Sequence, residues 1–188
     1  TARGIYDGYV NGAPLTEDWF TPGASQYDKH IQYQVYDITK RLQPGANAMG
    51  FYLASGWWSD AQTYTLMNYN YFGDRPSLLA MLELRYEDGT QEVIGTDCES
   101  WRYSGEGPVL YASNFHGEQY DARREAEISA FSTAAYAHEA WSAPARIHPV
   151  PIPEEEQAQP WPAPNHTDPE ITAQIGPSVG VVDILTAK

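Results

Sequence analysis

The sequence is poor in basic residues and in cysteine. It holds 11 Lys and Arg against 25 Asp and Glu, so the formal net charge is −14 at pH 7. A surface this acidic repels phosphates and anionic lipids, which argues against nucleic acids and membranes as partners. It suits a neutral ligand, or a cation that brings its own charge. Cys98 is the only cysteine, which excludes an intrachain disulfide and leaves the redox compartment undetermined.

Long apolar runs and familiar catalytic signatures are also missing. No apolar run approaches the ~20 residues that span a bilayer, so we expect no transmembrane segment. The five histidines never fall at His-x-x-x-His spacing, which argues against zinc. Neither Gly-x-Ser-x-Gly nor Gly-x-x-x-x-Gly-Lys occurs. No signal peptide is visible, and the chain enters a strand-like pattern almost at once, so we expect a fragment of a longer polypeptide.

Aromatic residues and short alternating runs are plentiful instead. The 188 residues include 14 Tyr and 6 Trp, and they suffice for one core with room for a tail. Between residues 5 and 112, period-2 segments are separated by Gly, Pro, Asn and Asp, which is typical of strands. The clearest covers 78–86. The Asp88-Gly89 pair that follows it predicts a hairpin turn to a second strand at 91–94. Further strands are expected at 6–10, 31–36, 47–55, 101–103 and 109–111. Antiparallel strands with one solvated face predict an all-β, two-sheet β-sandwich.

The remaining segments contain turns, short helices and a strap. Asp37 is expected to cap a short helical turn before Pro44-Gly45 reverses the chain. Ala- and Glu-rich stretches favour a helical patch at 122–130 or 133–140. Nine of the 14 prolines lie between residues 144 and 177, which predicts an extended strap, either free or laid on the domain. A last strand is expected at 179–185. We therefore divide the chain into a sandwich domain, 1–143, and a Pro-rich linker, 144–188, leading toward a domain outside this sequence.

The 21 residues from Gly56 to Pro76 show no strand or helix period and form the first candidate site. Their aromatic rings offer flat faces for a sugar, and their carboxylates and amides offer oxygens for hydroxyls or for a hard cation. In the alternative interpretation, half of the rings plug one end of the sandwich. The candidates for sugar contact are Trp57, Trp58, Asp60, Tyr64, Asn68, Asn70 and Asp74, and those for Ca²⁺ are Asp60, Asn68, Asn70 and Asp74.

A second polar cluster follows at residues 117–123. Glu118 and Asp121 are candidates for binding sugar hydroxyls or a cation. The alternative, which we prefer, is a charged latch in which these carboxylates pair with Arg123 or Arg124 at the exit of the sandwich. Arg75 directly follows Asp74 in the sequence, so an ion pair with a structural role is the preferred interpretation for Asp74 as well.

Several of these segments, in order, resemble the N-terminal β-sandwich domain of bacterial α-L-rhamnosidases. The resemblance covers about residues 3–125 and extends loosely into the Pro-rich tail. It rests on YDGYVNG at 6–12, Pro22-Gly23, Tyr27-Asp28-Lys29, YQVYD at 33–37, Gly56-Trp57, GDRP at 73–76 and GEQYDAR at 117–123. A weaker likeness, to the sugar-binding jelly roll of β-galactosidase-type enzymes, rests on Val10-Asn11-Gly12 and the turn at 37–47.

The resemblance implies a galactose-binding-like jelly roll that serves an α-L-rhamnosidase as an accessory domain. Binding of L-rhamnose or a related sugar is the implied role, with Ca²⁺ as an optional bridge between protein and sugar. Relatives commonly carry Trp-Thr-Asp where this chain has Ala24-Ser25-Gln26, so one acidic candidate is missing. The implied partners are a rhamnose-containing glycan and the other domains of the parent chain, in a periplasmic or secreted setting rather than the cytoplasm.

Glycoside hydrolysis by this chain itself is not expected. The reaction needs two carboxyl groups ~5 to 9.5 Å apart, and 25 acidic residues guarantee such a pair by chance. In the resembled enzymes the catalytic carboxylates belong to a large helical barrel downstream, and no segment here has the length of one. Two functions therefore stay open: a non-catalytic sugar-binding module, or a structural spacer that packs beside the catalytic barrel and binds no sugar.

Overall fold

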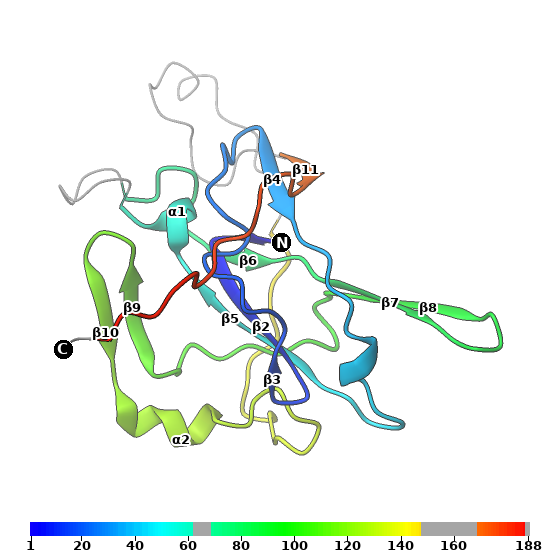
Figure 1. The fold of residues 1–188 in the computed structure, drawn as a ribbon. Coiled ribbons are helices and arrows are strands. Elements are labelled where there is room, and N and C mark those ends of the chain that lie inside the picture. Colours follow the sequence, from blue (N-terminus) through cyan, green and yellow to red (C-terminus); the bar gives the residue numbers. More distant parts are fainter. Residues whose placement is uncertain (62–68, 148–168, 187–188) are drawn as a thin grey trace.

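The computed structural model describes residues 1–61, 69–147 and 169–186, and most of its regular elements are strands (Figure 1). This confirms the all-β class. Within the described residues the strands form one three-stranded and four two-stranded sheets. The strands are β1 (Ala2–Arg3), β2 (Ile5–Val10), β3 (Ala13–Pro14), β4 (His30–Tyr33), β5 (Met49–Ala54), β6 (Ser77–Leu78), β7 (Met81–Arg85), β8 (Gln91–Gly95), β9 (Val109–Ser113), β10 (Gly117–Tyr120) and β11 (Glu170–Ala173).

The central sheet is β3-β2-β5, and its two long strands pair antiparallel over their whole length. The predicted alternation is present in β2: Tyr6, Gly8 and Val10 are buried on one face, while Asp7 is exposed on the other. Gly8 leaves room for a neighbouring ring, because a Cβ atom there would lie 2.8 Å from Phe51.

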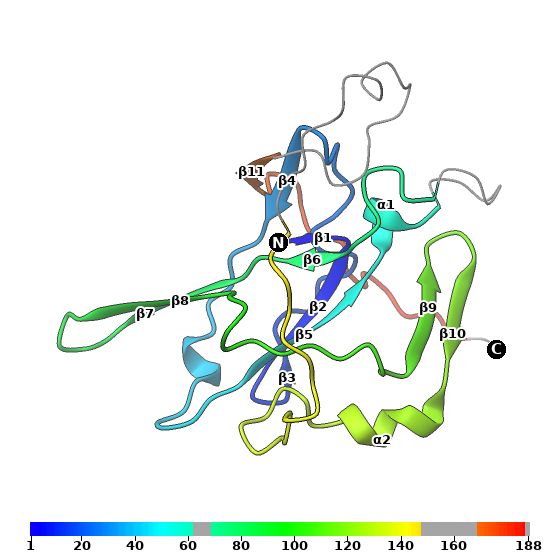
Figure 2. The same ribbon diagram turned by 180° about the vertical axis from the view of Figure 1, so that it is seen from behind.

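The predicted hairpin is confirmed: β7 and β8 pair antiparallel and project from the body (Figures 1 and 2). Its turn is closed by the N–H of Gly89, which donates to Tyr86 O at 3.0 Å. The Asp88 carboxylate accepts from the Thr90 N–H at 2.9 Å. These two hydrogen bonds, together with the short side chain of Asp88, account for the turn that the sequence predicted.

Gly89→Ala should lower the free energy of unfolding by about 1 kcal/mol. Gly89 has φ of 86° and nothing within 4 Å of a Cβ position, so the cost is backbone strain and not a clash. Urea denaturation measures the change. Gly105→Ala is the matched control, since its Cβ position is equally open and its φ lies outside the left-handed region. Equal stability of the two variants would contradict the assigned turn.

Residues 148–168 of the expected strap lie outside the described residues, and its last part is laid on the domain, as one of the two alternatives had it, but as a strand. Glu170–Ala173 form β11, which pairs parallel with β4, so the chain here is laid along the domain and one pair of the fold is parallel. Two expected strands are wrong. Residues 179–185 supply only an isolated bridge between Trp19 and Val179, and residues 101–103 only a bridge between Tyr103 and Ser142. The division at residue 143 stays a prediction.

Helical structure is sparse in the described residues. The expected short turn is present as η1 (Thr39–Arg41). Its N-cap position is Ile38, which has no side-chain cap, and Asp37 Oδ1, one residue earlier, accepts from the Thr39 N–H at 2.9 Å. The patch at 122–130 is also confirmed, as η2 (Ala122–Arg124) and α2 (Glu125–Ile128). The alternative patch at 133–140 forms turns only. No helix in the described part of the chain is long and apolar enough to cross a membrane.

Candidate functional site

The loop 56–76 begins with a helical turn, α1 (Gly56–Ser59), which the sequence did not predict. This turn places Trp58 in the core, where it is fully buried with Tyr27 and Ile31. The indole Nε1 donates to Arg75 O at 3.0 Å, and the ring centroid lies 5.5 Å from that of Tyr27. An open sugar platform does not fit this burial, so for Trp58 the plugging interpretation holds.

Trp57 is only partly buried and packs against the edge of this core. Its ring centroid lies 6.1 Å from that of Phe20, which lies 6.3 Å from that of Trp19. Trp19 and Phe20 keep 55% and 43% of their surface exposed. The three rings form a row, which we call the aromatic row, and it offers apolar faces to a pyranose ring.

Trp19 and Phe20 were missed as site residues by the sequence interpretation. Two adjacent aromatic residues in a polar stretch, next to Glu17 and Asp18, were the available signal. Phe20 has a φ of 59°, an unusual backbone conformation for a bulky residue. Residues held in this region recur at ligand sites.

Asp60 directly follows α1 and is buried, with 3% of its surface exposed. Its Oδ2 has no hydrogen-bond partner, and neither has the Oγ of the adjacent Ser59. Two more buried atoms without partners, Ser25 Oγ and Asp28 Oδ1, flank Tyr27, which packs on Trp58. An unpaired buried carboxylate oxygen is costly, and a hydroxyl or a cation would satisfy it.

The other loop candidates are dispersed. Asn70 is exposed, with its backbone N–H donating to Ser59 O at 3.2 Å. Asp74 Oδ1 lies 3.7 Å from Arg75 Nε. Tyr64 and Asn68 lie outside the described residues. No three His, Cys, Asp or Glu side chains come together as a metal group in the part of the chain that the structure covers. A Ca²⁺ ion takes six to eight oxygens, so Asp60 fits it and the described set as a whole does not.

The cluster at 117–123 forms the predicted latch. Asp121 accepts from Arg123 Nε at 2.8 Å and from Arg123 Nη2 at 2.7 Å, and the hydrogen-bonded guanidinium lowers the pKa of this carboxyl. Arg124 lies 3.8 Å from the same carboxylate and 3.2 Å from Glu106. Glu118 is exposed on β10, so these candidates belong to the β9–β10 hairpin and not to the α1 region.

A broad groove of about 3010 Å³ is lined by residues from both faces of the central sheet, among them Tyr9 and Phe51. Small-ligand pockets measure about 300 to 1,000 Å³, so this groove is too large for one sugar. Exposed apolar side chains line much of it, among them Leu53, Leu79, Met81, Val109 and Leu110. Its size suits an extended partner, a protein surface or a chain of sugars, better than one small molecule.

The model of the α-L-rhamnosidase N-terminal domain matches residues 1–167. The chain belongs to this family. An α-L-rhamnosidase from Streptomyces avermitilis is 40% identical over 143 residues, 76% of this chain, and one from Alteromonas sp. is 36% identical over 126 residues, 66% of this chain.

Solved structures agree with this assignment. The crystal structure of the Streptomyces avermitilis α-L-rhamnosidase complexed with L-rhamnose matches 97% of this chain, with a TM-score of 0.80 and 34% identity. The native enzyme from Aspergillus terreus matches 82% of the chain, with a TM-score of 0.73 and 30% identity. The chain spans 13% of the length of each of the two curated relatives and 16% to 17% of the two solved chains.

Proposed function

We propose that this α-L-rhamnosidase N-terminal domain is a non-catalytic accessory domain that binds L-rhamnose or a related neutral sugar. The aromatic row, in which Trp19 and Phe20 are exposed, carries the proposal together with Asp60, which ends the helical turn that holds Trp57 and has an unpaired carboxylate oxygen. Trp57 and Phe20 would contact the C–H face of the sugar, and Asp60 would accept from a hydroxyl. The complex of the Streptomyces relative with L-rhamnose makes this sugar the first probe.

We also propose that Asp60 can bind Ca²⁺. If a cation bound there, Asp60 would hold it, and the cation would supply positive charge that bridges the carboxylate to sugar hydroxyls. The residues of the chain would still orient the sugar through the aromatic row. A rise in melting temperature with Ca²⁺ that disappears in Asp60→Asn would support this role.

Trp57→Ala should weaken sugar binding about tenfold without unfolding the domain. The ring is partly exposed at the edge of the core, so its removal deletes one side of the platform and leaves the buried Tyr27–Trp58 pair in place. Calorimetric titration with L-rhamnose measures the affinity, and circular dichroism confirms the fold. Tyr103→Ala, an exposed aromatic residue outside the row, is the matched control and should bind as the wild type does. Unchanged affinity in Trp57→Ala would remove the platform from the proposal.

The isolated chain should not release the aryl group from an aryl α-L-rhamnoside. The chain spans only 13% of the two curated enzymes, and no described element forms a helical barrel. Absorbance of the freed phenol measures turnover against a denatured control. Turnover clearly above that control would contradict the non-catalytic assignment.

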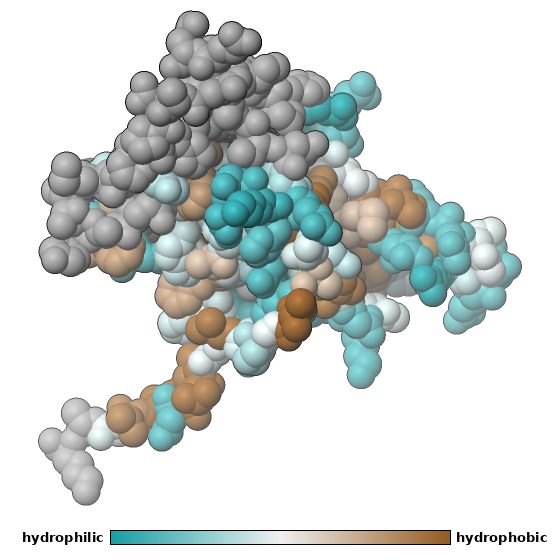
Figure 3. Space-filling view, turned by 90° about the horizontal axis from the view of Figure 1, so that it is seen from above, coloured by the Kyte–Doolittle hydropathy of each residue, from teal (hydrophilic) through white to brown (hydrophobic). Residues whose placement is uncertain are grey.

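A second candidate function is packing against the rest of a parent rhamnosidase. The broad apolar groove favours it. The residues after β11 favour it as well, since Val182, Ile184 and Leu185 are 82% to 101% exposed and extend as an apolar arm away from the body (Figure 3). Trp19 and Phe20 of the aromatic row also line this groove, so a packed partner would cover part of the proposed sugar site.

A further inference from the structure

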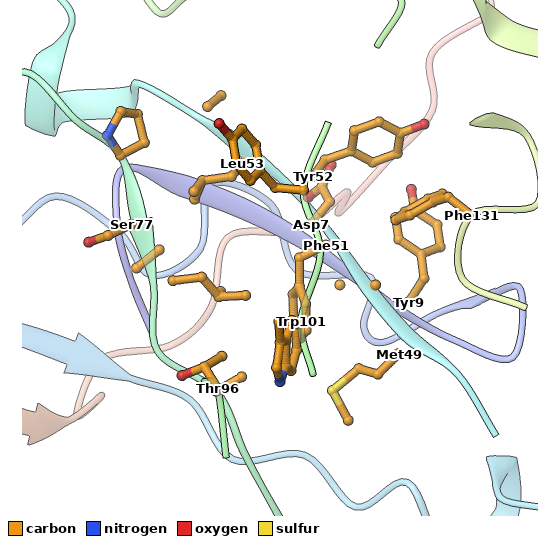
Figure 4. A pocket seen from close by; sticks show the side chains of 18 of the residues that line it. Asp7, Tyr9, Met49, Phe51, Tyr52, Leu53, Ser77, Thr96, Trp101 and Phe131 are labelled. Carbon is orange, nitrogen blue, oxygen red and sulfur yellow. The ribbon is translucent and has the colours of Figure 1, made fainter. Parts of the chain in front are cut away.

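One face of the central sheet carries polar and aromatic side chains that are not part of the aromatic row. Asp7 and Tyr9 lie on one face of β2, and Tyr52 is the direct antiparallel partner of Asp7 on β5. Phe131, which follows α2, lies over the same face (Figure 4). Figure 4 also shows Phe51 and Trp101 on the other side of the strand pair, as the alternation of side chains requires.

The three rings form a tight group. The centroid of Tyr52 lies 4.9 Å from that of Phe131 and 5.9 Å from that of Tyr9, and Tyr9 lies 5.6 Å from Phe131. Gly50, the strand partner of Tyr9, makes this possible, because a Cβ atom there would stand 2.6 Å from the Phe131 ring. The backbone of the adjacent Ser132 is fixed by a hydrogen bond from the Gly12 N–H at 3.2 Å. The group is therefore held by packing and not by loose surface contact.

Hydrogen-bonding groups surround the rings. Asp7 is exposed, and its carboxylate has no hydrogen bond or ion pair among the described residues. Its pKa is raised by partial desolvation, and its charge helps to raise the pKa of Tyr9. Partial desolvation raises the pKa of Tyr52, and the nearby Tyr120 and Glu125 raise it further by charge repulsion. The face thus offers phenol hydroxyls, which donate and accept, and an unpaired carboxylate acceptor.

We propose that Asp7, Tyr9, Tyr52 and Phe131 form a second binding face for a neutral pyranose ring. The inference rests on the proposed sugar-binding function but places a site on the sheet, away from loop 56–76. The rings contact the apolar face of the sugar, Asp7 accepts from its hydroxyls, and the tyrosine hydroxyls complete the hydrogen bonds. The two carboxylates, Asp7 and Glu125, disfavour a uronic acid. Because the groove is open, the face suits a residue within a glycan chain.

A nuclear magnetic resonance titration of the 188-residue chain tests this proposal. Methyl α-L-rhamnoside, added up to tens of millimolar, should shift the backbone amides of residues 7–9, 50–52 and 131. These shifts should persist in Trp57→Ala, where the aromatic row is incomplete. In Asp7→Ala they should need at least tenfold more sugar, since a charge-assisted hydrogen bond is lost. Tyr52→Phe keeps the ring and should weaken binding less than Asp7→Ala, and Tyr103→Phe should change nothing.

The outcomes separate the two proposals. Shifts confined to loop 56–76 and residues 19–20 would overturn the sheet site and leave the proposed function intact. Shifts confined to the sheet face would support the second site and move the proposed function away from the loop. No shift anywhere would overturn both. Binding of guanidinium ions, lost in Asp7→Ala with no response to the sugar, would show a site for basic groups and would also overturn the proposal.

Discussion

Trp58→Ala should lower the free energy of unfolding by about 3 to 5 kcal/mol. The ring is fully buried, contacts Tyr27 and Phe72, and lies 5.0 Å below the guanidinium of Arg3. Removing it leaves a cavity in a core that contains few other large buried side chains. Thermal and urea unfolding measure the loss, and a variant that is largely unfolded at 25 °C is within the expected range.

Two variants make this test specific. Trp19→Ala is the matched control, because that tryptophan is 55% exposed and should cost no more than about 1 kcal/mol. Trp58→Phe retains most of the packing but loses the hydrogen bond to Arg75 O, so an intermediate loss is expected. If Trp58→Ala were as stable as Trp19→Ala, the core position of Trp58 would be wrong and a binding role for it would reopen.

Asp60→Asn should raise the free energy of unfolding by about 1 to 2 kcal/mol in the absence of ligand. The wild-type side chain is 3% exposed and its Oδ2 has no hydrogen-bond partner, so the fold buries an unsatisfied carboxylate oxygen. Replacing it by a neutral amide removes most of that cost. The same substitution should weaken sugar binding, since the acceptor beside the aromatic row is lost. Gain in stability with loss of binding is typical of a residue retained for a ligand.

Differential scanning calorimetry in buffer treated with a chelator measures the stability change. Asp183→Asn serves as control. This carboxylate is exposed and stays hydrated in the folded protein, so the substitution should change the free energy of unfolding little. Ligand at 100 times its dissociation constant should stabilise the wild type by about 2.7 kcal/mol and the variant by much less. A less stable Asp60→Asn would show that the carboxylate is structural, and it would remove Asp60 from the proposed site.

The strands of the central sheet and the β7–β8 hairpin could be predicted because their signals are local. Alternation fixes the faces of β2, and Asp88-Gly89 supplies the turn. Strand β11 could not be predicted, because prolines dominate the preceding residues and its partner β4 is 140 positions earlier in the chain. Such long-range parallel pairing leaves no mark in a short window of sequence. The strand expected at 179–185 does not form, although its apolar run is a clear local signal, because a strand also needs a neighbouring strand to pair with.

The candidate site shows the same limit at the level of single residues. Trp57 and Trp58 are identical in type and adjacent, and the sequence gives no way to rank them. A helical turn rotates successive side chains by about 100°, so α1 directs one ring into the core and the other toward Phe20. The turn itself has poor helix formers at Gly56 and Ser59, and packing of Trp58 stabilises it. Tertiary structure therefore decides which tryptophan is available to a ligand.

The most direct measurement is calorimetric titration of the intact 188-residue chain with L-rhamnose, compared with D-glucose at the same concentrations. A few hydrogen bonds and one stacking face must offset the entropy of association, so a dissociation constant in the micromolar-to-millimolar range is expected for L-rhamnose. We predict saturable heat with L-rhamnose and clearly weaker binding of D-glucose. Absence of heat with L-rhamnose at tens of millimolar, from a protein shown to be folded, would contradict sugar binding and leave packing within a parent enzyme as the function.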